Sequence, residues 1–233
     1  MSSPLEFEQV INYTFQDKTI LERALTHSSF LPQAPDRALH NNERLEFLGD
    51  AFLDAIISAE LCRLLPYVPE GVLSKKRAQI VCEKALAEVG ENIGIGNYML
   101  MGTGEEVKGG RHRASILADA MEAVIGAIYI DGGYEAAADY VLRTMEPMIE
   151  LALSGKLFAD YKSALQEQVP PGNLYKLHYN LMGTSGPDHD KTFYVELVYD
   201  HEVIGAGSGK NKKEAEMQAA KEALERVGEG LVF

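Results

Sequence analysis

In the stretch Asn41–Ile57, NNERLEFLGDAFLDAII, acidic residues recur at helical spacing within an otherwise apolar run. At about 100° per residue, the acids fall within an arc of roughly 80° on one side of a helix. Apolar residues fill the opposite face and also flank the acids, so the helix is expected to be buried nearly all round. Like charges at these spacings repel one another, and burial adds a desolvation cost. A compensating positive charge is therefore expected beside Glu43, Glu46, Asp50 and Asp54.

A second stretch, Ala114–Ile130, ASILADAMEAVIGAIYI, holds only two charged residues, Asp119 and Glu122, on one helical face. A buried carboxylate without a partner must protonate, pair with a base or coordinate a cation, and this helix offers no Lys or Arg. Oxygen ligands gathered without His or Cys favour Mg²⁺ or Mn²⁺ over zinc. The two helices together predict a site for a divalent metal ion.

Two other interpretations of the first helix stay open at this point. Its acidic stripe could be a solvated face, or Arg44 and Arg77 could pair with the acids. Each interpretation accounts for one helix only, and the second helix would need an explanation of its own. The joint occurrence therefore favours the metal.

Before Ser154 the sequence predicts helices and no strands. Apolar residues recur at helical spacing in five segments, expected as helices over residues 18–27, 41–65, 71–89, 114–130 and 134–153. The glycine-rich segment Met101–Gly110 is expected to be a surface loop. Cys62 and Cys82 fall within apolar helical patterns and lack CxxC spacing, so they are expected to fill the core as reduced thiols.

After Ser154 the pattern changes to a small α+β module. Alternation with period two predicts strands over residues 192–197 and 202–208, with a turn near Asp200 and His201. Helices are expected over residues 160–168 and 212–227 on either side of these strands. A helix, strands and a second helix in about 70 residues indicate a compact two-layer domain.

The chain has 233 residues and a formal net charge of −13, of which −10 lies before Ser154 and −3 after it. Taken alone, this charge argues against a nucleic-acid-binding protein. The composition, with 46% hydrophobic residues, is that of a globular protein. No apolar run approaches the ~18–20 residues that a membrane helix requires, and the first residues do not resemble a secretory signal. We therefore expect a cytoplasmic protein without a membrane partner.

Several motifs resemble those of a known family. NERLEFLGDA at Asn42–Ala51 and ILADAMEAVIGAIYIDGG at Ile116–Gly133 closely resemble the two signature helices of the ribonuclease III endonuclease domain. ALTHSSF at Ala24–Phe30 and PEGVLSKKRAQIV at Pro69–Val81 extend the resemblance over nearly the whole first half. Three further motifs resemble a double-stranded RNA-binding domain: DYKSALQEQV at Asp160–Val169, GPDHDKTF at Gly186–Phe193 and GAGSGKNKKEAEMQAAKEAL at Gly205–Leu224.

This is the domain plan of bacterial ribonuclease III, and the resemblance implies its architecture. An all-α endonuclease domain is expected over residues 1–153 and a linker over residues 154–159. A small α-β-β-β-α RNA-binding domain is expected over residues 160–228. The resemblance also implies a homodimer that forms through the endonuclease domain, with Glu43–Asp50 near its interface.

The implied activity is Mg²⁺-dependent hydrolysis of phosphodiester bonds in double-stranded RNA, with Mn²⁺ as a substitute for Mg²⁺. The expected products carry 5′-phosphate and 3′-hydroxyl ends, and the implied substrates are precursors of ribosomal RNA and other structured transcripts, including mRNA and tRNA. The implied metal ligands are Glu46, Asp50, Asp119 and Glu122, with Glu43 and Glu70 as supporting acids at the same centre. Glu70 rests on the resemblance alone, because an acid at a helix start also favours the helix dipole.

Lys210, Lys212 and Lys213 stand at the start of a predicted helix, where the helix dipole disfavours cations. This placement indicates an anionic ligand such as a phosphate, although solvated lysines partly neutralised by Glu214 and Glu216 remain the alternative. Recognition of duplex RNA calls for contacts to two minor grooves and to the phosphates between them. The resemblance implies that these contacts come from Gln166, Glu167, Pro187, His189, Lys210, Asn211, Lys212 and Lys213.

Two departures from the family pattern matter. Asn211 stands where the family usually has Ser, and its side chain can still cap the helix. The stretch Tyr175–Ser185 is longer than the usual connection into the next motif, so the sequence does not fix the register of the first strand there, or of a bulge in it.

Two alternatives to a nuclease are kept. One is a protein of the same architecture that binds duplex RNA without cutting it, although every required carboxylate is present. The other is an all-helical metal-storage or scaffold protein, which leaves the RNA-binding motifs unexplained.

Overall fold

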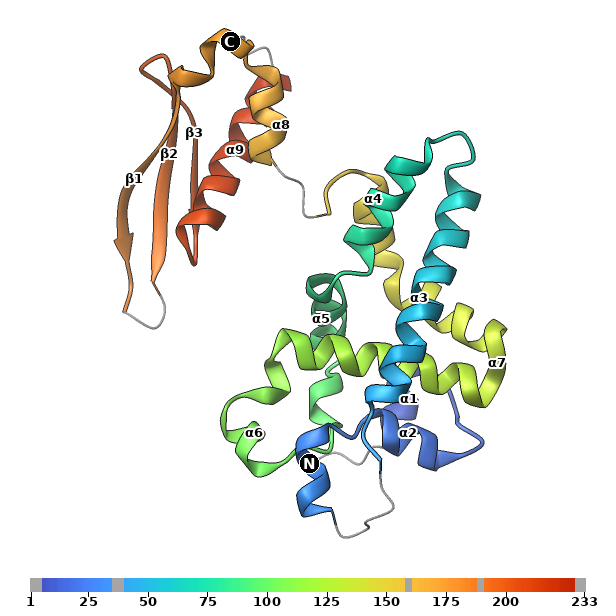
Figure 1. Ribbon diagram of the computed structural model, residues 1–233. Coiled ribbons are helices and arrows are strands. Elements are labelled where there is room, and N and C mark those ends of the chain that lie inside the picture. The colour runs from blue at the N-terminus through green and yellow to red at the C-terminus, as the bar shows by residue number, and fades with distance from the viewer. Residues whose placement is uncertain (1–5, 35–39, 158–160, 188–190, 229–233) are drawn as a thin grey trace. The chain divides into compact units, whose positions relative to one another are not determined.

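The computed structural model describes residues 6–34, 40–157, 161–187 and 191–228 of the chain (Figure 1). The chain divides into two compact units, residues 1–157 and 158–233. The described part of the first unit is helical, and the second unit combines a three-stranded sheet with helices. The predicted fold class, an all-α domain followed by a small α-β-β-β-α domain, is confirmed.

The helices of the first unit follow the apolar periodicity of the sequence. Short 3₁₀ segments connect several of them: η2 (Ser28–Gln33), η3 (Ile95–Asn97) and η4 (Gly110–His112). The α-helices are α1 (Phe7–Ile11), α2 (Lys18–Ala24), α3 (Glu43–Leu64), α4 (Glu70–Ile80), α5 (Glu83–Asn92), α6 (Thr103–Val107) and α7 (Ala114–Leu153). Among the described helices, none is long and apolar enough to cross a membrane.

Helices α3 and α7 cross at two glycines in the centre of this unit (Figure 1). A Cβ atom on Gly49 of α3 would lie 1.8 Å from the carbonyl oxygen of Glu122. A Cβ atom on Gly126 of α7 would lie 2.2 Å from the carbonyl oxygen of Leu45. The two backbones therefore touch, and a side chain at either position would force the helices apart. Apolar residues on both sides of the crossing are buried, among them Leu53, Ile57, Ala123 and Ile128.

Helix α7 joins the two segments that the sequence predicts as separate helices. The break between them survives as a kink at Gly133, whose φ of 79° and ψ of −173° are not helical. Positive φ is tolerated by glycine because it lacks a Cβ atom.

Three predictions for this unit are wrong. The helix predicted over residues 71–89 is two helices, α4 and α5, because the backbone of Cys82 is extended with ψ at 156°. The predicted loop Met101–Gly110 contains helix α6. Cys62 is exposed and Cys82 is only partly buried, so these free thiols do not fill the core. Cys62 instead faces the space between α3 and α4, beside Ser74.

The second unit is an antiparallel sheet with its two α-helices packed on one face (Figure 1). Its elements are α8 (Tyr161–Gln168), η5 (Pro171–Lys176), β1 (Leu177–Ser185), β2 (Thr192–Tyr199), β3 (Glu202–Gly209) and α9 (Lys212–Gly228), and the strand order is β1-β2-β3. One buried cluster joins the helices to the sheet and consists of Leu165, Val195, Leu197, Ile204, Ala215, Ala219, Ala220 and Ala223. The predicted alternation in β2 is confirmed, since Val195 and Leu197 point into this cluster.

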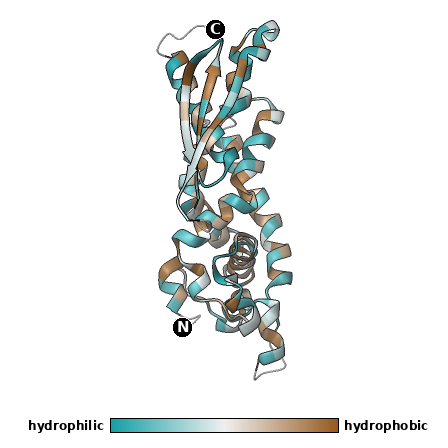
Figure 2. Ribbon diagram, turned by 90° about the vertical axis from the view of Figure 1, so that its left-hand side faces the viewer, coloured by the Kyte–Doolittle hydropathy of each residue, from teal (hydrophilic) through white to brown (hydrophobic). Residues whose placement is uncertain are grey.

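No helix among the described residues of this unit packs on the other face of the sheet, and hydrophilic and hydrophobic residues mix there (Figure 2). Strand β1 carries a bulge, because the register with β2 shifts between Leu181 and Gly183 and leaves Met182 as the extra residue. Most of the long stretch Tyr175–Ser185 thus forms one strand with a bulge in it, and its first two residues belong to η5. The predicted turn between β2 and β3 is present, with positive φ at Asp200 and His201.

Because α3 and α7 touch where they cross, one methyl group added there is expected to lower the stability of the fold strongly. Gly126→Ala is expected to cost about 2–4 kcal/mol, because backbone atoms of α3 cannot move aside as a flexible side chain would. In thermal unfolding followed by circular dichroism, Tm should fall by roughly 5–15 °C.

Gly104→Ala in α6 is the matched control, because a Cβ atom there meets nothing within 4 Å. It should leave Tm unchanged or raise it slightly, since Ala favours a helix over Gly. Equal Tm values for the two variants would contradict the close backbone contact.

Candidate active site

The start of α3 fixes the position of the first carboxylates. Glu43 and Glu46 lie in its first turn, where the helix dipole favours acids. The preceding residue, Asn42, is buried, and its N–H donates to the carbonyl oxygen of Thr26 at 2.9 Å. The N–H of Glu46 donates in turn to the carbonyl oxygen of Asn42 at 2.9 Å. These bonds tie the acidic end of α3 to the segment that follows α2.

The glycine crossing then brings the acids of α7 to the same place. Glu46 stands three residues before Gly49, and Glu122 stands four residues before Gly126, so each acid lies one turn from the crossing. One carboxylate oxygen from each of Glu46, Asp119 and Glu122 lies within 4.8 Å of the others. All three residues are partly buried. We call these three residues the carboxylate cluster.

Burial and nearby negative charges raise the pKa values of all three acids. Burial, followed by the charges of Asp50, Glu46, Asp119 and Asp54, raises the pKa of Glu122 to about 8. Burial, followed by the charges of Asp119, Glu43 and Asp50, raises the pKa of Glu46. Burial and the charge of Glu83 raise the pKa of Asp119, and the charge of His27 opposes this rise. Negative charge on this cluster is therefore unfavourable unless a cation lies beside it.

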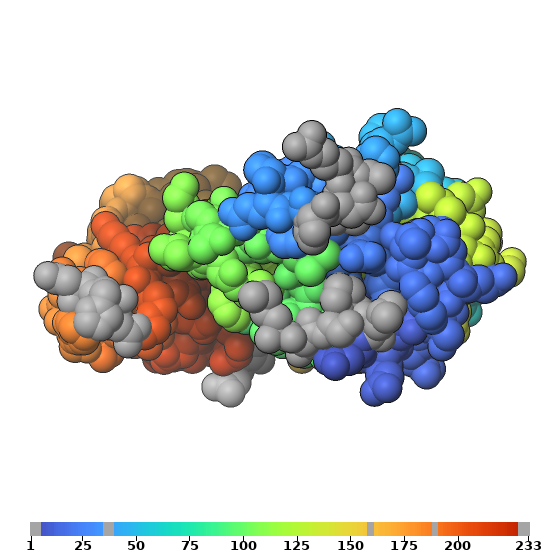
Figure 3. Space-filling view, turned by 90° about the horizontal axis from the view of Figure 1, so that it is seen from below, coloured from blue at the N-terminus to red at the C-terminus, as the bar shows by residue number. Residues whose placement is uncertain are grey.

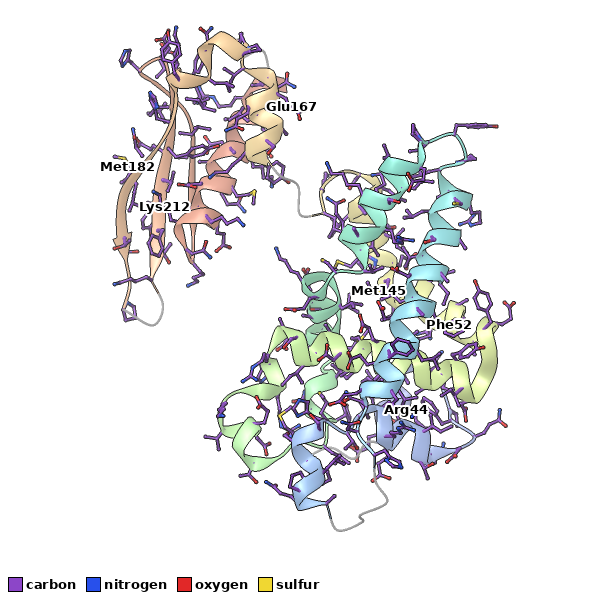
Figure 4. All side chains as sticks on the ribbon, viewed as in Figure 1. Arg44, Phe52, Met145, Glu167, Met182 and Lys212 are labelled. Carbon is purple, nitrogen blue, oxygen red and sulfur yellow. The ribbon has the colours of Figure 1, made fainter. Side chains whose placement is uncertain are left out.

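The arginines offered as an alternative explanation do not neutralise this charge. Arg77 Nε lies 3.8 Å from a carboxylate oxygen of Asp54, and Arg77 Nη1 donates to Ser58 Oγ at 2.9 Å. Arg44 is exposed near the start of α3 (Figure 4). Within the described ranges, no Lys or Arg forms an ion pair with Glu46, Asp119 or Glu122.

The residues present fit a divalent metal ion. The cluster offers three hard oxygen ligands from two rigid helices, and the described residues contribute no His or Cys to it. Such a ligand set suits Mg²⁺ or Mn²⁺. A bound cation would also remove the repulsion that raises the three pKa values.

The other predicted acids are not part of the carboxylate cluster. Asp50 is exposed on α3, and its charge acts on both Glu46 and Glu122. Glu43 is exposed and acts on Glu46. Glu70 is not part of the cluster: at the start of α4 it accepts a hydrogen bond from Ser74 Oγ at 2.5 Å. Its side chain lines a small cavity between α3 and α4 together with Arg77.

Sequence patterns do not single out two residues beside Asp119. Glu83 begins α5, a helix start that was not predicted because no Gly or Pro marks it. His27 belongs to a loop motif, and its place beside Asp119 depends on contacts between distant segments. A prediction of the helix break at Cys82 would have identified Glu83 as the start of a helix.

The start of α9 forms a second candidate site. Asn211 Oδ1 accepts a hydrogen bond from the Glu214 N–H at 2.9 Å, so the expected cap is present. Glu214 accepts a hydrogen bond from the Lys210 N–H at 2.7 Å. Lys212 Nζ lies 3.7 Å from Glu216, which also pairs with Lys162. Lys213 is exposed beside them.

The remaining predicted RNA contacts lie on exposed parts of the same unit. Gln166 and Glu167 are exposed at the end of α8, and Pro187 is exposed after β1. Glu167 on α8 and Lys212 on α9 both project from the helical layer that covers the sheet (Figure 4). His189 lies outside the described residues.

Comparison with known proteins assigns both units to described families. A family model described as Ribonuclease-III-like matches residues 17–148, and one described as Double-stranded RNA binding motif matches residues 161–227. A protein named Ribonuclease 3 from Caldanaerobacter subterraneus is 48% identical over 221 residues, which cover 95% of this chain and 96% of that protein. A Ribonuclease 3 from Clostridium perfringens is 43% identical over 225 residues, which cover 97% of this chain and 94% of that protein.

A solved structure resembles the first unit. It is the nuclease domain of ribonuclease III from Campylobacter jejuni, whose description refers to flexibility in a region involved in dimer formation. The identity is 44% and the TM-score is 0.57, with 61% of this chain and 95% of that chain covered.

The raised pKa of Glu122 predicts how the stability of the metal-free protein depends on pH. A carboxyl whose pKa rises from 4.5 unfolded to about 8 folded stabilises the fold in its protonated form, so stability is lost as pH rises through about 8. Tm measured in EDTA should fall between about pH 5 and pH 8, and Glu122→Gln should flatten this fall because its amide stays neutral.

Mg²⁺ should raise Tm of the wild type more at pH 8 than at pH 6, since metal binding displaces the proton. Glu122→Gln should lose most of that gain, whereas Glu150→Gln, an exposed change on the same helix, should keep it. A Glu122→Gln variant with the pH profile and Mg²⁺ response of the wild type would contradict the assignment.

Proposed function

The chain belongs to the ribonuclease III family, and from this premise we propose that it cleaves double-stranded RNA with the help of Mg²⁺ held at the carboxylate cluster. The observation that carries the proposal is the meeting of Glu46, Asp119 and Glu122 at the crossing of α3 and α7. A separate unit that matches a double-stranded RNA binding motif supports the choice of substrate. The products are 5′-phosphate and 3′-hydroxyl ends.

The residues of the site have different roles in phosphodiester hydrolysis. Glu46, Asp50, Asp119 and Glu122 hold Mg²⁺, or Mn²⁺ in its place. Glu43 adds negative charge next to Glu46, and Glu70 is a supporting acid from α4. When bound, the metal lowers the pKa of water and neutralises charge on the phosphoryl oxygens. The rigid helices keep the ligands in place, so no nucleophilic side chain is needed.

The second unit holds the duplex. Lys210, Lys212 and Lys213 contact phosphates at the N-terminal end of α9, where backbone N–H groups also favour anions, and Asn211 caps the helix between them. Gln166 and Glu167 face one minor groove, and Pro187 and His189 face the next, as the shape of duplex RNA requires. Recognition by shape makes sequence specificity weak.

Two copies of the endonuclease domain pair through the start of α3. Phe47, near the start of α3, lies next to Glu46 and is 80% exposed, which is unusual for a phenylalanine within an apolar stretch. Burial of this ring against a second copy would remove it from water. A homodimer places two cleavage sites on one duplex, one for each strand.

We propose domain limits of residues 1–153 and 160–228, joined by a linker over residues 154–159. Precursors of ribosomal RNA and other structured transcripts, mRNA and tRNA included, are the proposed substrates, and the cytoplasm is the proposed location. A protein that binds duplex RNA without cutting it is the second candidate, and a cleavage assay separates the two.

Cleavage of a labelled RNA duplex of about 30–40 base pairs tests the nuclease. With Mg²⁺ the wild type should release short duplexes, and with EDTA it should release none. Glu122→Ala should cut at least about 1,000-fold more slowly, because a metal ligand supports several kcal/mol of transition-state stabilisation.

Glu150→Gln on the same helix is the control and should cut at the wild-type rate. If the wild type binds the duplex in a gel shift and never cuts it, the protein is the RNA-binding alternative. Cleavage by Glu122→Ala at the wild-type rate would keep the nuclease and reject the ligand assignment.

Lys213 should contribute to RNA binding by the second unit and should not contribute to the stability of the fold. Lys213→Ala should weaken duplex binding and reduce by about one the slope of log Kd against log salt concentration. Its Tm should stay the same or rise, because a cation at a helix N-terminus is unfavourable.

Lys221→Ala, farther along α9, is the matched control and should leave both the affinity and the salt slope unchanged. Binding is to be measured by fluorescence anisotropy with Ca²⁺ in place of Mg²⁺, so that the RNA is not cleaved during the measurement. Equal salt slopes for Lys213→Ala and the wild type would show that Lys213 does not contact a phosphate.

A further inference from the structure

His27 is held against the start of α3 by the backbone on both sides of it. Its N–H donates to the carbonyl oxygen of Leu100 at 3.0 Å. The carbonyl oxygen of the preceding residue, Thr26, accepts the hydrogen bond from Asn42 that fixes the first turn of α3. Two backbone hydrogen bonds, which meet at Asn42, therefore link the segment of His27 to Glu46 of the carboxylate cluster.

Ser29 determines which ring nitrogen of His27 is free. The Ser29 N–H donates to His27 Nδ1 at 3.3 Å, and Ser29 Oγ lies 2.7 Å from the same nitrogen. Ser29 Oγ also accepts a hydrogen bond from the Gly102 N–H at 3.0 Å, so its own proton is available to Nδ1. Nδ1 is thus the acceptor, and the ring proton sits on Nε2.

The contact that orients Ser29 is part of the fold. A Cβ atom on Gly102 would lie 2.2 Å from the carbonyl oxygen of Ser29, so the two backbones approach as closely as glycine allows. Ser29 is part of η2 and Gly102 directly precedes α6, and these two segments lie side by side on the surface (Figure 3). The orientation of the imidazole is therefore rigid in the protein without substrate.

The half-buried ring of His27 lies near Asp119 of the carboxylate cluster. Among the residues that the structure describes, no acceptor for Nε2 is found. A pre-oriented donor beside a group of acids is placed for an acceptor that arrives from outside, and phosphate oxygens are such acceptors.

We propose that His27 Nε2–H donates a hydrogen bond to a non-bridging oxygen of the RNA phosphate that is bound over the carboxylate cluster. This inference rests on the proposed function and adds a substrate contact to it. The imidazole orients the phosphate and accepts no proton in the reaction. Ser29 is a positioning residue, because it acts only through the tautomer of His27.

Single-turnover cleavage of the RNA duplex with Mg²⁺ tests the contact. His27→Ala should cut about 10- to 100-fold more slowly, the loss expected for one hydrogen bond to a charged group. His27→Gln should recover most of the rate, because its amide N–H reaches about as far as Nε2. Duplex binding in Ca²⁺ should change less than about threefold, since most phosphate contacts lie in the other unit.

His112→Ala is the matched control, because His112 is exposed and pairs with Glu91 on the surface. Its rate should equal that of the wild type. A phosphorothioate at the cleaved position gives a readout that a structural role would not alter. Sulfur in place of one non-bridging oxygen should slow the wild type, and this effect should shrink in His27→Ala.

Several outcomes would overturn the inference. They are a wild-type rate for His27→Ala, an equal loss for the Ala and Gln variants with a lowered Tm, or an unchanged phosphorothioate effect. A wild type that fails to cut in Mg²⁺ would overturn the proposed function itself, and this inference with it.

Discussion

The contact between the backbones of α3 and α7 is the constraint on which the rest of the first unit depends. Gly49 and Gly126 allow the helices to approach until carbonyl oxygens occupy the space of a missing Cβ atom. At any larger separation, Glu46 and Glu122 would move apart and the carboxylate cluster would open. The same crossing buries the apolar faces of both helices, so the residues that fold the unit also set the geometry of its site.

In the metal-free protein, the arrangement that the function requires lowers the stability of the fold. Three partly buried acids repel one another, and burial raises the pKa values of all of them. A chain optimised for stability alone would replace them with apolar residues or pair them with bases. The described structure instead leaves the charge unpaired at a place where a cation and a phosphate can meet, and the helices supply the rigidity that keeps the acids together.

The sequence predicts those features that depend on local pattern. Charged residues inside apolar helices point to Asp119 and Glu122 and to an acidic stripe on α3 that contains Glu46, and period-two alternation predicts β2. Features that depend on tertiary contacts do not follow from such patterns. The break at Cys82 lacks Gly or Pro, so the start of α5 and the place of Glu83 were missed. Cys62 is exposed although it stands in an apolar helical pattern. The orientation of His27 depends on Leu100 and Gly102, far along the chain.

The central claim is that the crossing of α3 and α7 builds a site for a divalent metal ion. A crystal structure of the protein soaked in Mn²⁺, with anomalous data collected near the manganese edge, tests it most directly. We predict a peak within about 2.3 Å of carboxylate oxygens from Glu46, Asp119 and Glu122. No peak at these residues at a saturating Mn²⁺ concentration, or a peak held by other side chains, would contradict the account.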